Sequence, residues 1–182
     1  MNMLHQQPVL FTGACRSGKS TLAQTWCERR AGSKVYVATA GIRDAEMAER
    51  IERHQAARGG EWLTVEQAGG KDLAQILRDL PASTGAALVD CTTLWLAGLM
   101  EQGQDDSRIL GMTDELTALF PSLSFPLALV HNETGWGLVP EYPLGRRFRD
   151  LSGLVGQKLA AASGTVILAV CGLPLVLKGK LD

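Results

Sequence analysis

The sequence has no long apolar run and no excess of charge of either sign. No stretch approaches the roughly 20 consecutive apolar residues that a helix needs to span a bilayer, so a membrane-spanning protein is not expected. The net charge is -1, whereas a nucleic-acid-binding protein usually carries a basic excess, so nucleic acid is not an expected partner. Residues 1–8 lack the basic and apolar regions of a signal peptide. We therefore expect a cytoplasmic protein.

Cysteine is also scarce. The four cysteines, Cys15, Cys27, Cys91 and Cys171, are far apart and form no C-x-x-C pair. This spacing argues against a zinc site, and in a reducing compartment the thiols are expected to stay free. The rest of the composition, 46% hydrophobic and 20% charged over 182 residues, is typical of a globular protein and suits a single domain, residues 1–182.

Short apolar runs alternate with segments of helical periodicity. Strands are predicted at residues 9–12, 35–39, 86–90, 127–130 and 165–170, with a last short antiparallel strand near Leu175. Helices are predicted at residues 19–30, 44–58, 92–100, 105–120 and 144–162. The glycine pairs at 59–60 and 69–70 are interpreted as connections inside the domain. Continuous apolar strands that alternate with helices predict an α/β fold, with a mostly parallel sheet covered by helices on both faces.

A phosphate-binding motif lies between the first strand and the first helix. The pattern G-x-x-x-x-G-K-[ST] spans Gly13, Ala14, Cys15, Arg16, Ser17, Gly18, Lys19 and Ser20. Its glycines let backbone N–H groups turn inward toward phosphate oxygens, and the helix adds its positive end. Lys19 is expected to act as a catalytic residue that reaches the β- and γ-phosphates, and Ser20 to ligate Mg²⁺. The motif predicts that the chain binds a nucleoside triphosphate.

An acidic residue at the end of another strand usually completes the magnesium shell beside such a loop. Asp90 ends the third predicted strand and suits this role, although an aspartate here also suits a cap for the helix that begins at Thr92. Glu133, after the fourth strand, is a second candidate. Three functions stay open on these residues: a nucleotidyltransferase, a small-molecule kinase without a nucleotidyl step, and a non-catalytic GTP-binding module.

His54 is a candidate nucleophile on the predicted helix 44–58, where it shares a face with Arg50. This helix follows the strand after the phosphate loop, and the carboxyl ends of parallel strands face the ligand crevice. A neutral imidazole there can attack an α-phosphate and hold the nucleotidyl group as a phosphoramidate. A histidine on a helix is more often solvated or a core contact, and His131, at the end of the fourth strand, competes for the role.

Several segments together resemble one enzyme family, the bifunctional adenosylcobinamide kinase / adenosylcobinamide-phosphate guanylyltransferase of cobalamin biosynthesis. The segments are residues 12–20, 35–40, 44–51, 62–66, 88–95, 132–140, 147–150 and 172–174. Many kinases share the phosphate loop, whereas NETGWGLVP at 132–140 and RFRD at 147–150 are far more specific. The resemblance runs nearly end to end and is weakest between residues 100 and 127.

The resemblance implies a P-loop NTPase fold of the RecA-like class and two reactions. ATP or GTP phosphorylates the hydroxyl on the aminopropanol arm of adenosylcobinamide. GTP then supplies GMP to adenosylcobinamide phosphate, which gives adenosylcobinamide-GDP and pyrophosphate. The resemblance also implies that His54 carries the GMP, and that the chain forms a homotrimer with sites near the subunit borders.

The resemblance further implies which residues contact GTP. Beyond the phosphate loop they are Ala38, Thr39, Ala40, Gln55, Ala56, Ala57, Arg58, Glu66 and Asp90. Arg58 can pair with a phosphate, and Glu66 can accept from a guanine or ribose donor, although a solvated surface carboxylate is the alternative for Glu66. The segment 146–150 has two interpretations: a solvated helix face with internal ion pairs, or part of a subunit contact or substrate pocket.

Overall fold

The computed structural model describes residues 7–40, 62–66 and 71–181. The described elements are, in chain order, β1 (Val9–Gly13), α1 (Lys19–Glu28), β2 (Ser33–Ala38), β3 (Trp62–Glu66), α3 (Leu73–Arg78), β4 (Thr84–Asp90), α4 (Thr92–Glu101), α5 (Asp106–Leu119), the 3-10 helix η2 (Phe120–Ser122), β5 (Leu127–Asn132), α6 (Pro143–Ala162), β6 (Thr165–Val170) and β7 (Leu173–Lys178). The predicted helix 44–58, which carries His54, lies outside the described residues.

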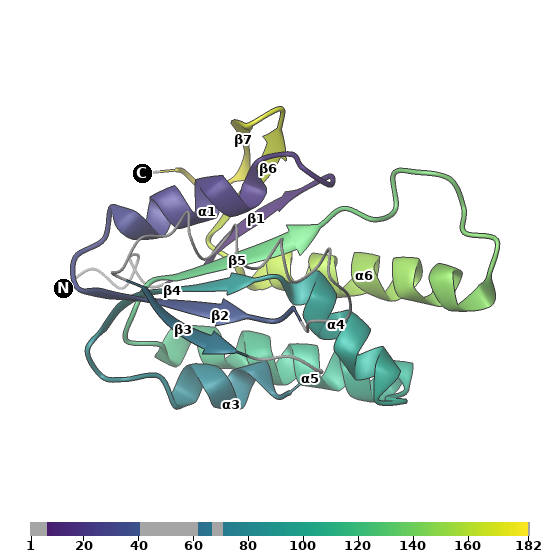
Figure 1. Ribbon diagram of the computed structural model, residues 1–182, viewed down its shortest axis with the longest axis horizontal. Helices are drawn as coiled ribbons and strands as arrows, with labels where there is room; N and C mark the ends of the chain where they lie inside the picture. Colours follow the sequence, from purple (N-terminus) through teal and green to yellow (C-terminus); the bar gives the residue numbers. More distant parts are fainter. Residues whose placement is uncertain (1–6, 41–61, 67–70, 182) are drawn as a thin grey trace.

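The strands form one seven-stranded sheet in the order β3-β2-β4-β5-β1-β6-β7 (Figure 1). Strands β1 to β6 pair in parallel, and only β7 runs antiparallel, against β6. β5 therefore separates β1, which leads into the phosphate loop, from β4, which ends at Asp90. This order confirms the predicted mostly parallel sheet, the antiparallel last strand and the P-loop NTPase fold of the RecA-like class.

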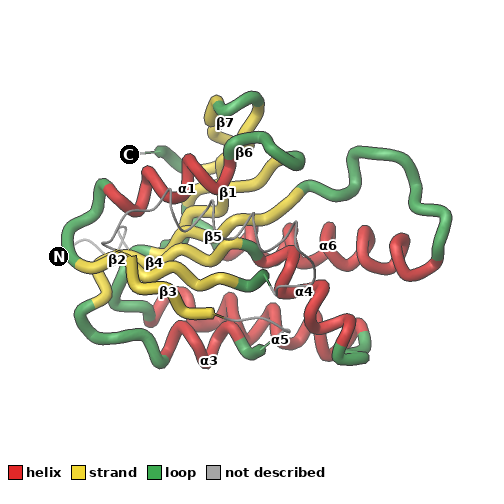
Figure 2. The backbone as a smooth tube through the Cα atoms, viewed as in Figure 1, coloured by secondary structure: helices red, strands yellow, loops and turns green. Residues whose placement is uncertain are grey.

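Side chains alternate along β1 between two cores on opposite faces of the sheet. Phe11 packs in one core with Ala23 and Trp26 of α1. Leu10 packs in the other, which also contains Leu116 of α5 and other apolar residues of α3, α4 and α6. Figure 2 shows α1 on one side of the sheet and α3, α5 and α6 on the other. The alternation places Thr12 on the same face as α6.

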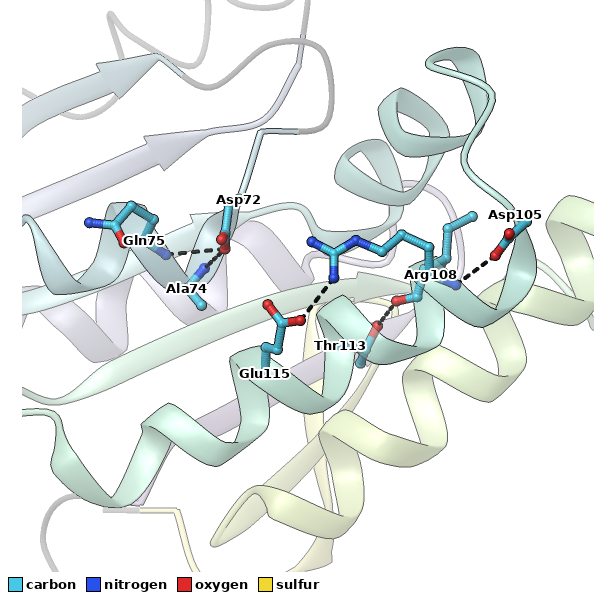
Figure 3. A network of polar contacts seen from close by, with 8 residues as sticks. Asp72, Ala74, Gln75, Asp105, Arg108, Thr113 and Glu115 are labelled. Atoms are coloured by element: carbon cyan, nitrogen blue, oxygen red, sulfur yellow. Dashed lines mark hydrogen bonds and ion pairs between the residues drawn. The ribbon is translucent and has the colours of Figure 1, made fainter.

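Two helices on that second face begin at aspartate caps, as Figure 3 shows. Asp72 Oδ1 accepts from the backbone N–H groups of Ala74 and Gln75 at 2.9 and 3.1 Å. Asp105 Oδ1 accepts from the N–H of Arg108 at 2.7 Å. Each cap satisfies a donor that has no partner within its own helix. No described helix is long and apolar enough to cross a membrane.

The sequence did not predict β3 or α3. β3 has five residues and pairs on one side only, with β2. α3 has six residues, which is too short to show helical periodicity clearly. Both follow the glycine pairs that were interpreted as plain connections, so the correction adds one edge strand and one short helix to the predicted order.

Candidate active site

The phosphate loop joins β1 to α1 at the carboxyl edge of the sheet. Gly18 is the N-cap of α1 with φ 94°, a left-handed conformation that favours glycine. A Cβ at this position would lie 2.8 Å from the Cα of Gly172, and the Gly172 N–H donates to the Ser17 carbonyl at 2.8 Å. In the described part of the chain, the N–H groups of Arg16 and Ser20 donate to no protein acceptor. The loop therefore presents backbone donors at a helix N-terminus, as an anion site requires.

Lys19 lies within this loop and not on the surface. Its residue is 7% exposed, and its ammonium Nζ donates to the Ala14 carbonyl at 3.0 Å. The side chain therefore folds back over the residues that precede it. This geometry holds a positive charge at the centre of the loop, where the β- and γ-phosphates of a bound nucleotide would lie.

Asp90 lies at the same edge of the sheet and does not cap a helix. Its Oδ2 accepts from the hydroxyl of Tyr36 at 3.0 Å, whereas the N-cap of α4 is Cys91, without a side-chain cap bond. The alternation along β4 places Asp90 on the same face as Tyr36 and α1. The cap interpretation is wrong, and the carboxylate is half-buried at the end of β4, two strands from β1.

The register of the parallel strands places the described nucleotide-contact candidates Glu66, Ala38 and Asp90 in one row across the sheet. Glu66 pairs with Ala38, Ala38 with Asp90, Asp90 with Val130 and Val130 with Phe11. Glu66 therefore lies four strands from β1, or about 19 Å at 4.8 Å per strand. Thr39 follows Ala38 and is 2% exposed. Its hydroxyl donates to the Cys91 carbonyl and accepts from the Cys91 N–H, each at 2.7 Å, so it ties the ends of β2 and β4 together.

His131, the competing nucleophile candidate, is enclosed beneath α6. It is 2% exposed, and its Nε2 lies 3.1 Å from the Ser152 carbonyl oxygen while its Nδ1 lies 2.9 Å from Thr92 Oγ1. A carbonyl only accepts, so we assign the ring proton to Nε2. Nδ1 then shares the Thr92 hydroxyl proton with the Val130 carbonyl oxygen, which lies 3.2 Å from Thr92 Oγ1. Burial lowers the pKa of the imidazole and outweighs the opposing effect of Glu133. Both ring nitrogens are engaged, which argues against a free nucleophile at His131.

Substitutions at two glycines of α6 test how closely this helix packs on His131. A Cβ on Gly156 would lie 3.0 Å from Nε2 of His131, whereas a Cβ on Gly153 would meet nothing within 4 Å. We expect Gly153→Ala to raise the free energy of unfolding by about 0.5–1 kcal/mol through helix propensity. Gly156→Ala should lower it by about 1–3 kcal/mol, because the hydrogen-bonded ring cannot move away. Denaturant unfolding of both variants measures the difference, and equal stabilisation by both would contradict this account of His131.

Glu133 is held beside the first residue of the phosphate loop. Its N–H donates to the Gly13 carbonyl at 3.0 Å, and its Oε1 accepts from the hydroxyl of Thr12 at 2.5 Å. It has no ion-pair partner among the described residues. Sequence reasoning had named Glu133 but missed Thr12, because the two lie 121 positions apart and only the pairing of β1 with β5 brings them together.

The segment 146–150 contacts neighbouring parts of the chain and makes one internal ion pair. Arg147 pairs with Asp106 at 2.7 Å and Arg149 with Asp150 at 3.6 Å, while Arg146 Nη1 donates to the Glu141 carbonyl at 2.6 Å. Only the pair of Arg149 with Asp150 is internal to the segment, as the first interpretation expects, whereas Arg147 joins α6 to α5. The remaining candidates, His5, His54, Gln55, Ala56, Ala57 and Arg58, lie outside the described residues.

Comparisons with known proteins agree on one family. A family model described as cobinamide kinase / cobinamide phosphate guanyltransferase matches residues 9–177. The chain belongs to this family. The protein named bifunctional adenosylcobalamin biosynthesis protein CobP from Pseudomonas aeruginosa is 39% identical, over 94% of this chain and 97% of its own length. Two proteins named bifunctional adenosylcobalamin biosynthesis protein CobU are 34% identical (Escherichia coli) and 36% identical (Salmonella typhimurium), each over 93% of this chain and 99% of its own length. The resemblance drawn from the sequence is confirmed.

The reactivity of the thiols in this cobinamide kinase / cobinamide phosphate guanyltransferase tests whether nucleotide binds at its phosphate loop. Cys15 and Cys171 are exposed, whereas Cys27 and Cys91 are buried, and burial raises the pKa of Cys27 to about 12 and of Cys91 to about 11. We expect a thiol reagent to modify Cys15 and Cys171 in the native protein and all four cysteines after denaturation. GTP should slow modification of Cys15, which lies in the loop. Peptide mass spectrometry measures each site, and fast modification of Cys27 or no protection of Cys15 would contradict the expectation.

Proposed function

We propose that this chain phosphorylates the aminopropanol hydroxyl of adenosylcobinamide with ATP or GTP, and then transfers GMP from GTP to adenosylcobinamide phosphate through a GMP–His54 intermediate. The observation that carries the proposal is a formed phosphate loop in a chain that matches the family along nearly its whole length. The whole chain, residues 1–182, would act as one catalytic domain.

The nucleotide would lie along the carboxyl edge of the sheet. Its phosphates would bind the loop residues Gly13, Ala14, Cys15, Arg16, Ser17, Gly18, Lys19 and Ser20. From there it would extend past Asp90 and Ala38–Ala40 toward Glu66. The separation of about 19 Å between β1 and Glu66 supports contact of Glu66 with the nucleoside and not with the phosphates. Gln55, Ala56, Ala57 and Arg58 complete the proposed contacts.

In the kinase step, the acceptor hydroxyl oxygen attacks the γ-phosphorus and the bond to the β–γ bridging oxygen breaks. The leaving diphosphate takes the electron pair. Lys19 and the backbone donors of the loop stabilise the charge that develops on the phosphates. The product is adenosylcobinamide phosphate.

In the second step, the neutral imidazole of His54 attacks the α-phosphorus of GTP and pyrophosphate leaves. A phosphate oxygen of adenosylcobinamide phosphate then attacks the same phosphorus and releases the histidine. The enclosure of His131 supports His54 as the nucleophile, because the chain has only three histidines and His5 lies outside the family match.

Magnesium fits the proposed site by the chemistry of its donors. Ser20 and Asp90 offer a hydroxyl and a carboxylate, and Mg²⁺ is usually bound by one or two carboxylates, waters and substrate phosphates. The described residues contain no cluster of three or more acidic, histidine or cysteine ligands, and a phosphate-bound Mg²⁺ requires none. When bound, the ion neutralises charge on the phosphate oxygens.

Homotrimeric assembly in the cytoplasm, without nucleic acid, completes the proposal. The large apolar side chains Leu138, Val139, Tyr142, Leu144, Leu173 and Leu175 are all exposed. They lie in the segment between β5 and α6, at the first turn of α6, and on the edge strand β7 (Figure 1). Exposed apolar groups of this extent mark contact surfaces, which supports burial between subunits.

The test is a covalent adduct. The protein is incubated with α-labelled or γ-labelled GTP and Mg²⁺, denatured, and examined for label that survives base and is lost in acid, as a phosphoramidate should be. We expect retention of the α-label only, and none in His54→Ala. Absence of α-label in the wild type would reduce the proposal to a P-loop kinase without a nucleotidyl step or to a GTP-binding module.

A further inference from the structure

A pocket of about 380 Å³ lies on the α6 face of the sheet, opposite the face that carries α1. Its lining includes Thr12 at the end of β1, Glu133 after β5, and Arg149 and Gly153 of α6. Thr12 directly precedes the phosphate loop, so the pocket and the loop meet at the end of β1. None of the proposed nucleotide contacts lines this pocket.

Glu133 is the one carboxylate among the described residues that line the pocket, and no ion pair joins it to a described lysine or arginine. Its Oε1 accepts from Thr12 Oγ1 at 2.5 Å. In the described part of the chain the carboxylate makes no other hydrogen bond or ion pair, and it acts electrostatically on His131, which lines the same pocket. Arg149 lines the same pocket, yet it pairs with Asp150 at 3.6 Å. The bond from the Glu133 N–H to the Gly13 carbonyl holds the Glu133 backbone beside the loop. The bond from Thr12 orients the carboxylate through Oε1, and Oε2 has no hydrogen-bond partner among the described residues.

We propose that this pocket receives the alcohol arm of the acceptor and that Glu133 is the general base of the kinase step. The inference rests on the function proposed above and assigns a residue and a subsite that the phosphate loop does not supply. The Glu133 carboxylate accepts the hydroxyl proton as the oxygen attacks the γ-phosphorus. The β–γ bridging oxygen leaves with its electron pair, and the proton passes from Glu133 to solvent afterwards.

The size of the pocket fits an arm and not a whole corrinoid. About 380 Å³ is the space of a small ligand, so the macrocycle would stay outside. Two large apolar side chains of the lining, Trp136 and Leu177, are 68% and 58% exposed. They offer an apolar rim for the body of the acceptor, while Glu133 lies beside the end of β1.

Asp90 is less suited to be the base. It lies on β4, with β5 between it and β1, and it belongs to the α1 face, where its Oδ2 accepts from Tyr36. It does not line the pocket. The two carboxylates therefore lie on opposite faces of the sheet, which suits separate tasks.

The chemistry of the two reactions gives a selective test. An alcohol must lose a proton to become a good nucleophile, and a positioned base contributes about 10²–10⁴-fold. The acceptor of the second reaction is a phosphate that is already an anion and needs no base. Glu133→Gln should therefore lower kcat for phosphorylation of adenosylcobinamide by about 10²–10⁴-fold. Formation of the GMP adduct and GMP transfer to added adenosylcobinamide phosphate should stay within about threefold of wild type, and Glu133→Asp should restore part of the kinase rate.

A kinase rate of Glu133→Gln near the wild-type value would overturn the assignment of the base. An equal fall in both reactions would also overturn it, because it would show a role in folding or nucleotide binding. Failure of the proposed function looks different: the wild-type protein itself would then transfer no phosphate to adenosylcobinamide.

A substitution on α6 tests whether the acceptor binds in this pocket. Gly153 lines it, and a Cβ there meets nothing within 4 Å, so Gly153→Leu should fold and obstruct the subsite. We expect its KM for adenosylcobinamide to rise at least tenfold while its KM for GTP stays unchanged. Gly111→Leu on α5 is the matched control, because a Cβ at Gly111 also meets nothing within 4 Å and Gly111 lies outside the pocket. An unchanged KM for adenosylcobinamide in Gly153→Leu would overturn the placement of the acceptor.

Discussion

Lys19→Ala is expected to lower kcat/KM of both the kinase and the guanylyltransferase reactions by about 10³-fold. The Lys19 ammonium lies inside the phosphate loop, where its residue is 7% exposed and its Nζ donates to the Ala14 carbonyl. Both reactions build negative charge on the triphosphate, at the leaving diphosphate in one and at pyrophosphate in the other. Steady-state assays with adenosylcobinamide and, separately, with adenosylcobinamide phosphate measure the two effects.

Lys158→Ala is the control for this prediction. Lys158 is a lysine of α6 that pairs with Asp114 at 2.5 Å on the surface, so its removal should leave both rates unchanged. If Lys19→Ala abolished one reaction and spared the other, a single phosphate loop could not serve both. The account would then need a second nucleotide site.

His54→Ala should separate the two activities. We expect GMP transfer to fall by about 10⁴-fold or more, because the nucleophile is removed, while phosphorylation of adenosylcobinamide stays within a few-fold of wild type. The product should then accumulate as adenosylcobinamide phosphate, which chromatography separates from adenosylcobinamide-GDP.

His5→Ala and His131→Asn are the matched histidine variants. His5→Ala should be indistinguishable from wild type in both assays. His131→Asn should still form the adduct, because His131 has both ring nitrogens engaged beneath α6, although it should unfold at lower denaturant concentration. Loss of the adduct in folded His131→Asn would return the role of nucleophile to His131.

Most of the fold could be predicted because parallel strands that are covered on both faces are continuous apolar runs. β4 and β5 are buried at nearly every position, and each was predicted from its apolar residues alone. β3 was missed because this edge strand has exposed positions at Leu63 and Glu66, so its hydrophobic signal is weak. Its strand conformation depends on pairing with β2, which periodicity does not reveal.

The site could be predicted only where its chemistry is local in the sequence. The phosphate loop is such a case, since the strand, the glycines, the lysine and the helix follow one another. The contact between Thr12 and Glu133 and the bond from Gly172 to Ser17 join distant segments, and they exist only because β1 lies between β5 and β6. The tertiary structure was also needed to choose between the two interpretations of Asp90. Its carboxylate accepts a hydrogen bond from Tyr36 and does not cap a helix.

The central claim is that one chain carries out both transfers on the same acceptor. The direct measurement is to supply the purified protein with adenosylcobinamide, Mg²⁺ and GTP, in parallel reactions with label in the α- or the γ-phosphate, and to isolate the corrinoid product. The account predicts that adenosylcobinamide-GDP contains one label per molecule in each of the two reactions, the γ-label from the first GTP and the α-label from the second. A corrinoid product that contains the γ-label alone, or no label, would contradict it.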